Sequence, residues 1–188
     1  VAPDRAAADV AEACRGALSG AGQTVVLALP LDVQLLPATE AVHLAFVGDP
    51  AVAPVPALGP LLDALANARR PVFIAGRGAI RDASVGRAQL TALAERCGAL
   101  LAVSAAAKGL FAGDPWYLDV SGGFATPLAA ELITDADLIV AWGCTLNMWT
   151  TRHGRLIGQG ATVVQVDLDP AALGVNRRVD LAICGDGT

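Results

Sequence analysis

Pro71–Gly78 reads PVFIAGRG and Thr162–Pro170 reads TVVQVDLDP, and these two stretches decide the fold. Each begins with a run of β-branched and other apolar residues that is typical of a buried strand. The first ends in a glycine turn and the second in carboxylates. Glycine lets backbone N–H groups approach a phosphate, and an acid at a strand's carboxyl end can hold ribose hydroxyls. The pair therefore predicts a dinucleotide-type scaffold.

Helices and strands alternate around these two stretches. Apolar residues at helical spacing predict helices over 58–65, over 84–97 with Ser84 as the cap, and from 126 onward with Leu128 facing inward. A short helix is expected before residue 162. Apolar runs predict the remaining strands at Leu100–Val103, Asp137–Trp142 and Val179–Cys184, and residues 108–124 are expected to form a glycine-rich loop. This order predicts an α/β fold with a doubly wound, parallel, six-stranded sheet, Rossmann-like and of the DHS-like NAD/FAD-binding type.

The first part of the chain follows another pattern. Asp4–Leu18 carries apolar residues at helical spacing, and Thr24–Leu29 is expected to be a strand. Six prolines between residues 30 and 60 then indicate a linker or an extended crossing. One helix and one strand do not make a domain, so the domain proper is expected to begin near Val55.

Composition excludes several classes of protein. The 188 residues are 54% hydrophobic and carry a net charge of −5 with scattered basic residues, which argues against nucleic acid as a partner. Lys108 interrupts the apolar run before it reaches the roughly 20 residues that span a bilayer, so no membrane span is expected. The four cysteines form no CxxC pair. We therefore expect reduced thiols, no export signal and a cytoplasmic location.

Two strand ends supply candidate ligand contacts. Gly76, Arg77, Gly78 and Ala79 follow the first strand, but no third spaced glycine completes a dinucleotide fingerprint, so a tight turn is the alternative. Asp167 is placed where a ribose would lie, with plain solvation as its alternative. Asp169 is expected to cap the turn that begins at Pro170.

The loop GCTLNMWT, residues 143–150, follows the strand expected at the switch point of the sheet. Gly143, Thr145 and Asn147 could contact a ligand there, whereas Met148 and Trp149 are expected to pack. Cys144 has no neighbouring base and is interpreted as a packing thiol. Solvated or capping roles are expected for His43 and His153. No catalytic residue and no metal ligand is predicted in this chain.

Five segments together resemble thiamine diphosphate-dependent enzymes of the acetolactate synthase type. They are GQTVVLALPLDVQ at 22–34, RPVFIAGRGA at 70–79, the loop at 108–123, ADLIVAWG at 136–143 and VQVDLDPAALGVNRRVDLAICGD at 164–186. The resemblance implies that residues 1–54 are the tail of a pyrimidine-binding domain plus a linker, and that 55–188 is the central domain. Flanking pyrimidine- and diphosphate-binding domains of the same polypeptide are then the expected partners, in a homodimer or tetramer.

The resemblance also implies the chemistry of the parent enzyme. It implies a thiamine diphosphate- and Mg²⁺-dependent lyase or transferase that acts on 2-keto acids, with its activating glutamate and its metal–diphosphate motif outside this chain. The terminal GDG at 185–187 lacks the downstream Asn of that motif. The chain alone is therefore expected to be inactive.

In flavin-containing members the central domain binds FAD. The corresponding positions here are Gly76–Ala79, the pair Gly122 and Gly123, Gly143–Thr150, and Asp167. The 143–149 loop departs from those members because it has no charged residue. Two alternatives to a scaffold within the parent enzyme therefore stay open: a self-contained module for FAD, NAD or ADP, and a purely structural domain that joins its neighbours and forms the dimer.

Overall fold

The computed structural model describes residues 5–18, 24–37, 56–80 and 82–186. The chain divides into two compact units, Val1–Val52 and Ala53–Thr188. His43 lies outside the described residues. No helix in the described ranges is long and apolar enough to cross a membrane.

The second unit is built on one six-stranded sheet whose pairings are all parallel, as predicted. The strand order is β3-β2-β1-β4-β5-β6, the Rossmann order. The strands are β1 Pro71–Ala75, β2 Leu100–Val103, β3 Tyr117–Val120, β4 Leu138–Trp142, β5 Thr162–Asp167 and β6 Leu181–Cys184.

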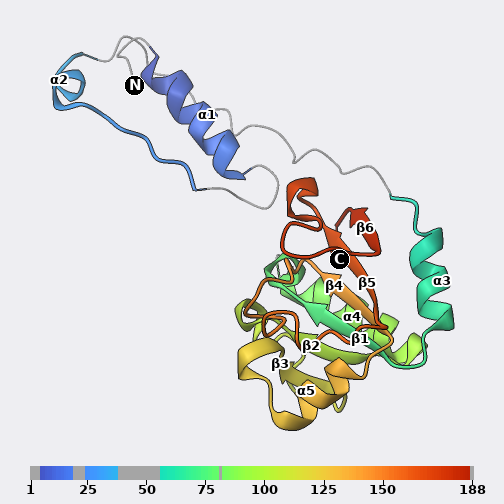
Figure 1. Cartoon of the computed structure of the whole chain (residues 1–188). Helices are drawn as coiled ribbons and strands as arrows, with labels where there is room; N and C mark the ends of the chain where they lie inside the picture. The colour runs from blue at the N-terminus through green and yellow to red at the C-terminus, as the bar shows by residue number, and fades with distance from the viewer. Residues whose placement is uncertain (1–4, 19–23, 38–55, 81, 187–188) are drawn as a thin grey trace. The chain divides into compact units, whose positions relative to one another are not determined.

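Helices cover both faces of this sheet, so the doubly wound prediction is confirmed (Figure 1). Helices α3 (Gly59–Asn67) and α4 (Ala83–Cys97) pack on the face that Phe73 and Val140 share. Helix α5 (Pro127–Thr134) packs on the other face, which carries Val72 and Ile139. Because successive strand residues point to opposite faces, a strand buried on both sides must be apolar throughout.

One strand was missed in the sequence. Strand β3 lies within the stretch that was expected to be a glycine-rich loop. It has only four residues, and the register of its pairing with β2 shifts between Leu101 and Val103. Asp119 within it has a φ of 63°, in the left-handed region. A short, bulged edge strand that contains an Asp gives almost no periodic signal.

Three helix predictions were wrong in detail. Asp82, not Ser84, caps α4, because its side chain accepts a hydrogen bond from the N–H of Val85. Leu128 is 64% exposed, since the inward stripe of α5 consists of Ala129, Ala130 and Ile133. The short helix that was expected directly before β5 is not formed, because the chain forms turns there.

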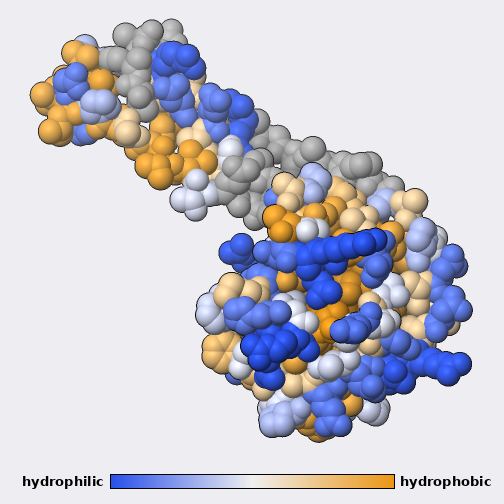
Figure 2. All heavy atoms as spheres, viewed as in Figure 1, coloured by the Kyte–Doolittle hydropathy of each residue, from blue (hydrophilic) through white to orange (hydrophobic). Residues whose placement is uncertain are grey.

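The first unit contains α1 (Ala6–Leu18) and the short α2 (Leu31–Gln34). The expected strand at Thr24–Leu29 is not formed, because these residues pair with no strand in the described part of the chain. Helix α1 buries none of its residues, and Val26 and Leu35 are 85% and 87% exposed. Apolar side chains therefore gather on the surface of this unit (Figure 2). A folded domain normally buries most such side chains.

Candidate functional site

The switch point of the sheet lies between β1 and β4, because the chain order reverses there. The turn Arg77–Ile80 follows β1, and the loop that begins at Gly143 follows β4. Carboxyl ends of parallel strands share one edge, so the predicted residues after β1, β3, β4 and β5 are brought to the same edge. Ligands of open α/β sheets bind at this place.

The glycines at the switch point pack against each other. The N–H of Gly76 donates to the carbonyl of Trp142 at 2.8 Å, and that of Gly78 donates to the carbonyl of Gly143 at 3.0 Å. Gly143 has a φ of +54°, and a Cβ on it would lie 2.5 Å from the Cα of Gly78. Glycine is therefore needed at these positions because the turn after β1 and the loop after β4 contact each other through their backbones.

The two other residues of the first turn differ in exposure. Ala79 is fully buried, and its N–H donates to the carbonyl of Gly76 at 3.1 Å. Arg77 is exposed. Arg77 is thus the one predicted contact in this turn whose charged side chain lies at the surface.

Gly122 and Gly123 meet the loop that follows β4. The N–H of Gly123 donates to the carbonyl of Trp149 at 3.1 Å, and Arg152 Nη2 donates to the carbonyl of Gly122 at 3.2 Å. The buried hydroxyl of Ser121 donates to the carbonyl of Thr150 at 2.9 Å. Gly122 has a φ of +92°, and a Cβ on it would clash with the backbone of residues 149 and 150. No pattern in the sequence predicted the contacts of Ser121 and Arg152.

Asp167 lies at the end of β5, partly buried, and its Oδ1 accepts the N–H of Asp169 at 3.1 Å. Asp169 caps the turn Pro170–Ala172 through the N–H of Ala171, as predicted. The carboxylate of Asp167 is therefore already part of the backbone turn that follows β5. The predicted contact of Asp167 with a ligand stays a prediction.

Gln165 is a buried residue that sequence reasoning missed. Its side chain is 1% exposed, donates to the carbonyls of Cys144 and Ala172, and accepts the N–H of Gly174. These bonds join the loop after β4 to the loop after β5. One amide in the middle of an otherwise apolar strand was the available signal, because a buried polar group needs hydrogen-bond partners.

The rest of the loop after β4 combines buried and exposed side chains. Cys144 is 3% exposed, and burial raises the pKa of its thiol to about 11, which agrees with a packing thiol. Asn147 Oδ1 accepts the N–H groups of Trp149 and Thr150 and so holds the turn. Met148 and Trp149 are 47% and 67% exposed, so the expectation that they pack was wrong.

Two further predicted features, His153 and Asp186, lie at the surface. His153 is exposed, with its ring centroid 6.5 Å from that of Trp149. Asp186, in the terminal GDG, is exposed. Within the described ranges no three His, Cys, Asp or Glu side chains form a group that could hold a metal ion.

Comparison with known proteins places this fold in a family. The model of the family "Thiamine pyrophosphate enzyme, central domain" matches residues 58–188. The chain is 33% identical over 123 residues to a probable acetolactate synthase large subunit of Methanocaldococcus jannaschii, covering 65% of this chain and 20% of that protein. It is 33% identical over 126 residues to a sulfoacetaldehyde acetyltransferase of Castellaniella defragrans, covering 65% of this chain and 21% of that protein.

An acetolactate synthase of Mycobacterium avium is 32% identical over 123 residues, which cover 65% of this chain and 20% of that protein. The chain thus spans about a fifth of the length of these curated relatives. The match of the family model covers the whole sheet, from α3 to β6. The chain belongs to the thiamine pyrophosphate enzyme central-domain family.

Proposed function

We propose that this chain is the scaffold domain of a thiamine diphosphate- and Mg²⁺-dependent enzyme that acts on 2-keto acids, of the acetolactate synthase type. The observation that carries the proposal is the match of residues 58–188 to the central-domain family. Relatives named acetolactate synthase support the reaction class. The sulfoacetaldehyde acetyltransferase supports the broader class of enzymes that transfer two-carbon units.

The chain's own residues supply structure in this proposal. Thiamine diphosphate, when bound, would supply carbanion chemistry to such an enzyme, and no residue of this chain is assigned a part in it. Among the described residues no three His, Cys, Asp or Glu side chains gather to hold a metal ion, and we assign the groups that hold the cofactor to other domains of a longer polypeptide. What this chain contributes is a rigid sheet between those domains and contact surface in a homodimer or tetramer.

Residues 1–54 are, in the same proposal, the tail of a preceding pyrimidine-binding domain together with a linker. Helix α1 without buried residues and the exposed Val26 and Leu35 support this, because such surface needs a partner. The central domain then runs from residue 55 to residue 188.

Activity measurements test the main proposal. The 188-residue chain and the complete reading frame that contains it are each assayed for carbon dioxide and acetolactate release from pyruvate, with thiamine diphosphate and Mg²⁺. We expect turnover only from a frame that adds both flanking domains, and no calorimetric binding of thiamine diphosphate to the chain. Turnover by the chain unaided would refute the scaffold role.

The packing at the switch-point edge supports one of the two alternative functions over the other. The amides of Gly76 and Gly78 are already used within the chain, and a Cβ on Gly143 would meet Gly78. These glycines are thus required without any phosphate, which favours the structural alternative over an FAD, NAD or ADP module. The chain is titrated with ADP and with FAD by calorimetry. The heat of each injection is expected to equal the heat of dilution, which means that neither nucleotide binds. Saturable binding that Arg77→Ala and Asp167→Ala abolish would establish the nucleotide module instead.

A further inference from the structure

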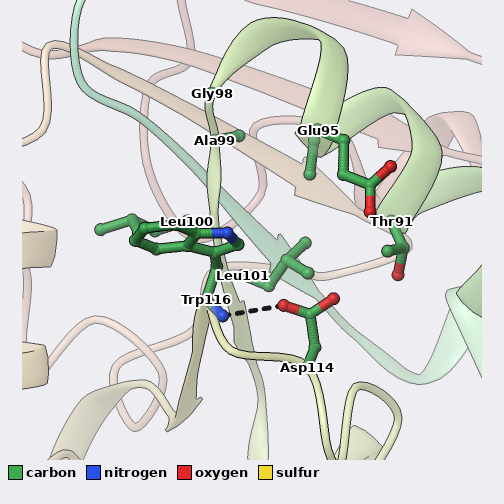
Figure 3. Close-up of a pocket in the computed structure, with 9 residues that line it drawn as sticks. Thr91, Glu95, Gly98, Ala99, Leu100, Leu101, Asp114 and Trp116 are labelled. Atoms are coloured by element: carbon green, nitrogen blue, oxygen red, sulfur yellow. Dashed lines mark hydrogen bonds between the residues drawn. The ribbon is translucent and has the colours of Figure 1, made fainter.

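A hollow of about 350 Å³ lies at the edge of the sheet opposite the switch point (Figure 3). Residues 98–101, which lead from α4 into β2, form one part of its lining, and Asp114 and Trp116, just before β3, form another. Its volume falls at the small end of the range of small-molecule sites, about 300–1,000 Å³. No predicted site residue lies in it.

The floor of this hollow is apolar and one wall is aromatic. Ala94, Ala99 and Leu101 line it and are 3%, 4% and 1% exposed, so they are fixed in the core. Trp116 is 62% exposed although it is the largest side chain of the lining. The backbone of Trp116 is held locally, because its backbone N–H donates to Asp114 Oδ1 at 2.8 Å and its carbonyl accepts the N–H of Leu101 at 3.1 Å.

The charged groups of the lining are all acidic. Glu95 projects from α4 and Asp114 from the segment before β3, on either side of Leu101 in Figure 3. Neither carboxylate forms an ion pair with any described Lys or Arg. An aromatic face and unpaired carboxylates around an apolar floor attract a cation that carries an apolar body.

We propose that this hollow binds a small organic cation, an ammonium, amidinium or guanidinium group on a flat or aliphatic body. The body lies on Leu101 and Ala99 beside the indole of Trp116, and the cationic head faces the carboxylates of Glu95 and Asp114. The site is at the amino ends of the strands, so it is separate from the switch point and does not depend on the proposed function. It gives the domain a binding surface apart from the switch-point edge.

Titration by heteronuclear NMR of the complete 188-residue chain tests this assignment. Benzamidinium is the probe, and benzamide, of the same shape without the charge, is its control. We expect benzamidinium to shift the Trp116 indole N–H signal, assigned with Trp116→Phe, and the amides of Gly98 and Leu101 with a saturable curve. Benzamide is expected to bind at least about tenfold more weakly, because a hydrogen bond to a charged group is worth about one factor of ten or more.

Variants separate this site from general attraction to an acidic protein. Glu95→Gln together with Asp114→Asn is expected to weaken benzamidinium at least about tenfold, whereas Glu131→Gln on the exposed face of α5 leaves it unchanged. Asparagine at 114 keeps an oxygen for the N–H of Trp116, and retained dispersion of the amide signals shows that the double variant folds. Equal binding of the two probes, shifts spread over the surface, or no saturation would overturn the proposal, and the probe pair decides it even without the variants.

Discussion

Gly143 shows how a single residue fixes the edge of the sheet where a ligand was expected. It combines a left-handed φ with a backbone contact to Gly78 that leaves no room for a Cβ. Gly143→Ala is therefore expected to lower the free energy of unfolding by about 2–4 kcal/mol, from backbone strain and overpacking together. Urea unfolding followed by circular dichroism measures the loss.

Gly109→Ala is the matched control for that substitution. Gly109 also has a left-handed φ, of +91°, but nothing lies within 4 Å of the position of its Cβ. It should lose only the strain contribution, about 1–2 kcal/mol. Equal losses in the two variants would mean that the contact between Gly78 and Gly143 contributes nothing.

Gln165 is the second residue on which this edge depends. Gln165→Leu leaves the N–H of Gly174 and the carbonyls of Cys144 and Ala172 without their side-chain partner. The free energy of unfolding should fall by about 2–4 kcal/mol, since an unsatisfied buried group costs about 1–3 kcal/mol. Urea unfolding of this variant is compared with that of Gln159→Leu, at an exposed position, which should change little. A loss below about 0.5 kcal/mol would contradict the network's role.

Asp137 links the starts of β1 and β4. It lies just before β4, and its carboxylate accepts the backbone N–H groups of Arg69 and Arg70, which lie just before β1. Burial alone would raise the pKa of Asp137, but the hydrogen bonds from Arg70 and Arg69 outweigh it and hold the pKa below its ordinary 3.8. A lowered pKa stabilises the folded state above the unfolded pKa, and this contribution is lost as pH falls through the folded pKa.

Asp137→Asn should therefore flatten the decline of stability between about pH 5 and about pH 2.5. Urea unfolding midpoints are measured across this interval for the wild type, for Asp137→Asn and for Asp63→Asn, an exposed acid on α3. The control should keep the wild-type slope. A wild-type slope in Asp137→Asn would show that the clamp between the elements does not depend on its charge.

Asp119 is the residue of edge strand β3 that we expect to keep this edge from pairing with another chain. This residue interrupts the register, accepts the hydroxyl of Tyr117 at 3.2 Å and pairs with Lys108 at 3.8 Å. Bulges and charges keep exposed edges from adding strands. Asp119→Val should lower the free energy of unfolding by about 1–2 kcal/mol, because a β-branched residue resists its φ of 63°. Asp119→Val should also speed the growth of light scattering from aggregates. Asp119→Asn should change neither the stability nor the scattering, because Asn tolerates this φ.

The elements differ in how far their sequence predicts them. Strands β1, β4 and β5 were predicted within a residue or so because burial on both faces makes them apolar throughout. Strand β3 was missed because a four-residue edge strand with a bulge needs no periodic pattern. The edge of the sheet at which the candidate residues lie could be predicted, because the carboxyl ends of parallel strands share one edge. The mutual packing of Gly76, Gly78 and Gly143 did not, since a sequence motif cannot distinguish glycine that admits a ligand from glycine that admits another loop.

At the scale of the whole molecule, the two units differ in how they are stabilised. The sheet of the second unit has a core on each face, whereas α1 of the first buries nothing among the described residues. The family match begins at residue 58, just before α3. The second unit thus has the core that an independent domain needs, whereas none of the described residues of the first unit is buried.

Deleting residues 1–54 should therefore leave the second unit folded. The thermal midpoint of chain 55–188 is expected within about 4 °C of that of the complete chain, a difference of no more than about 1 kcal/mol. Circular dichroism gives both midpoints, and the indole signals of Trp116, Trp142 and Trp149 report whether the core is intact. Chain 1–54 should show no cooperative transition, because its apolar residues have no core to enter. If chain 55–188 is insoluble or melts more than about 10 °C lower, the N-terminal residues complete the core of the sheet and the proposed boundary at residue 55 is wrong.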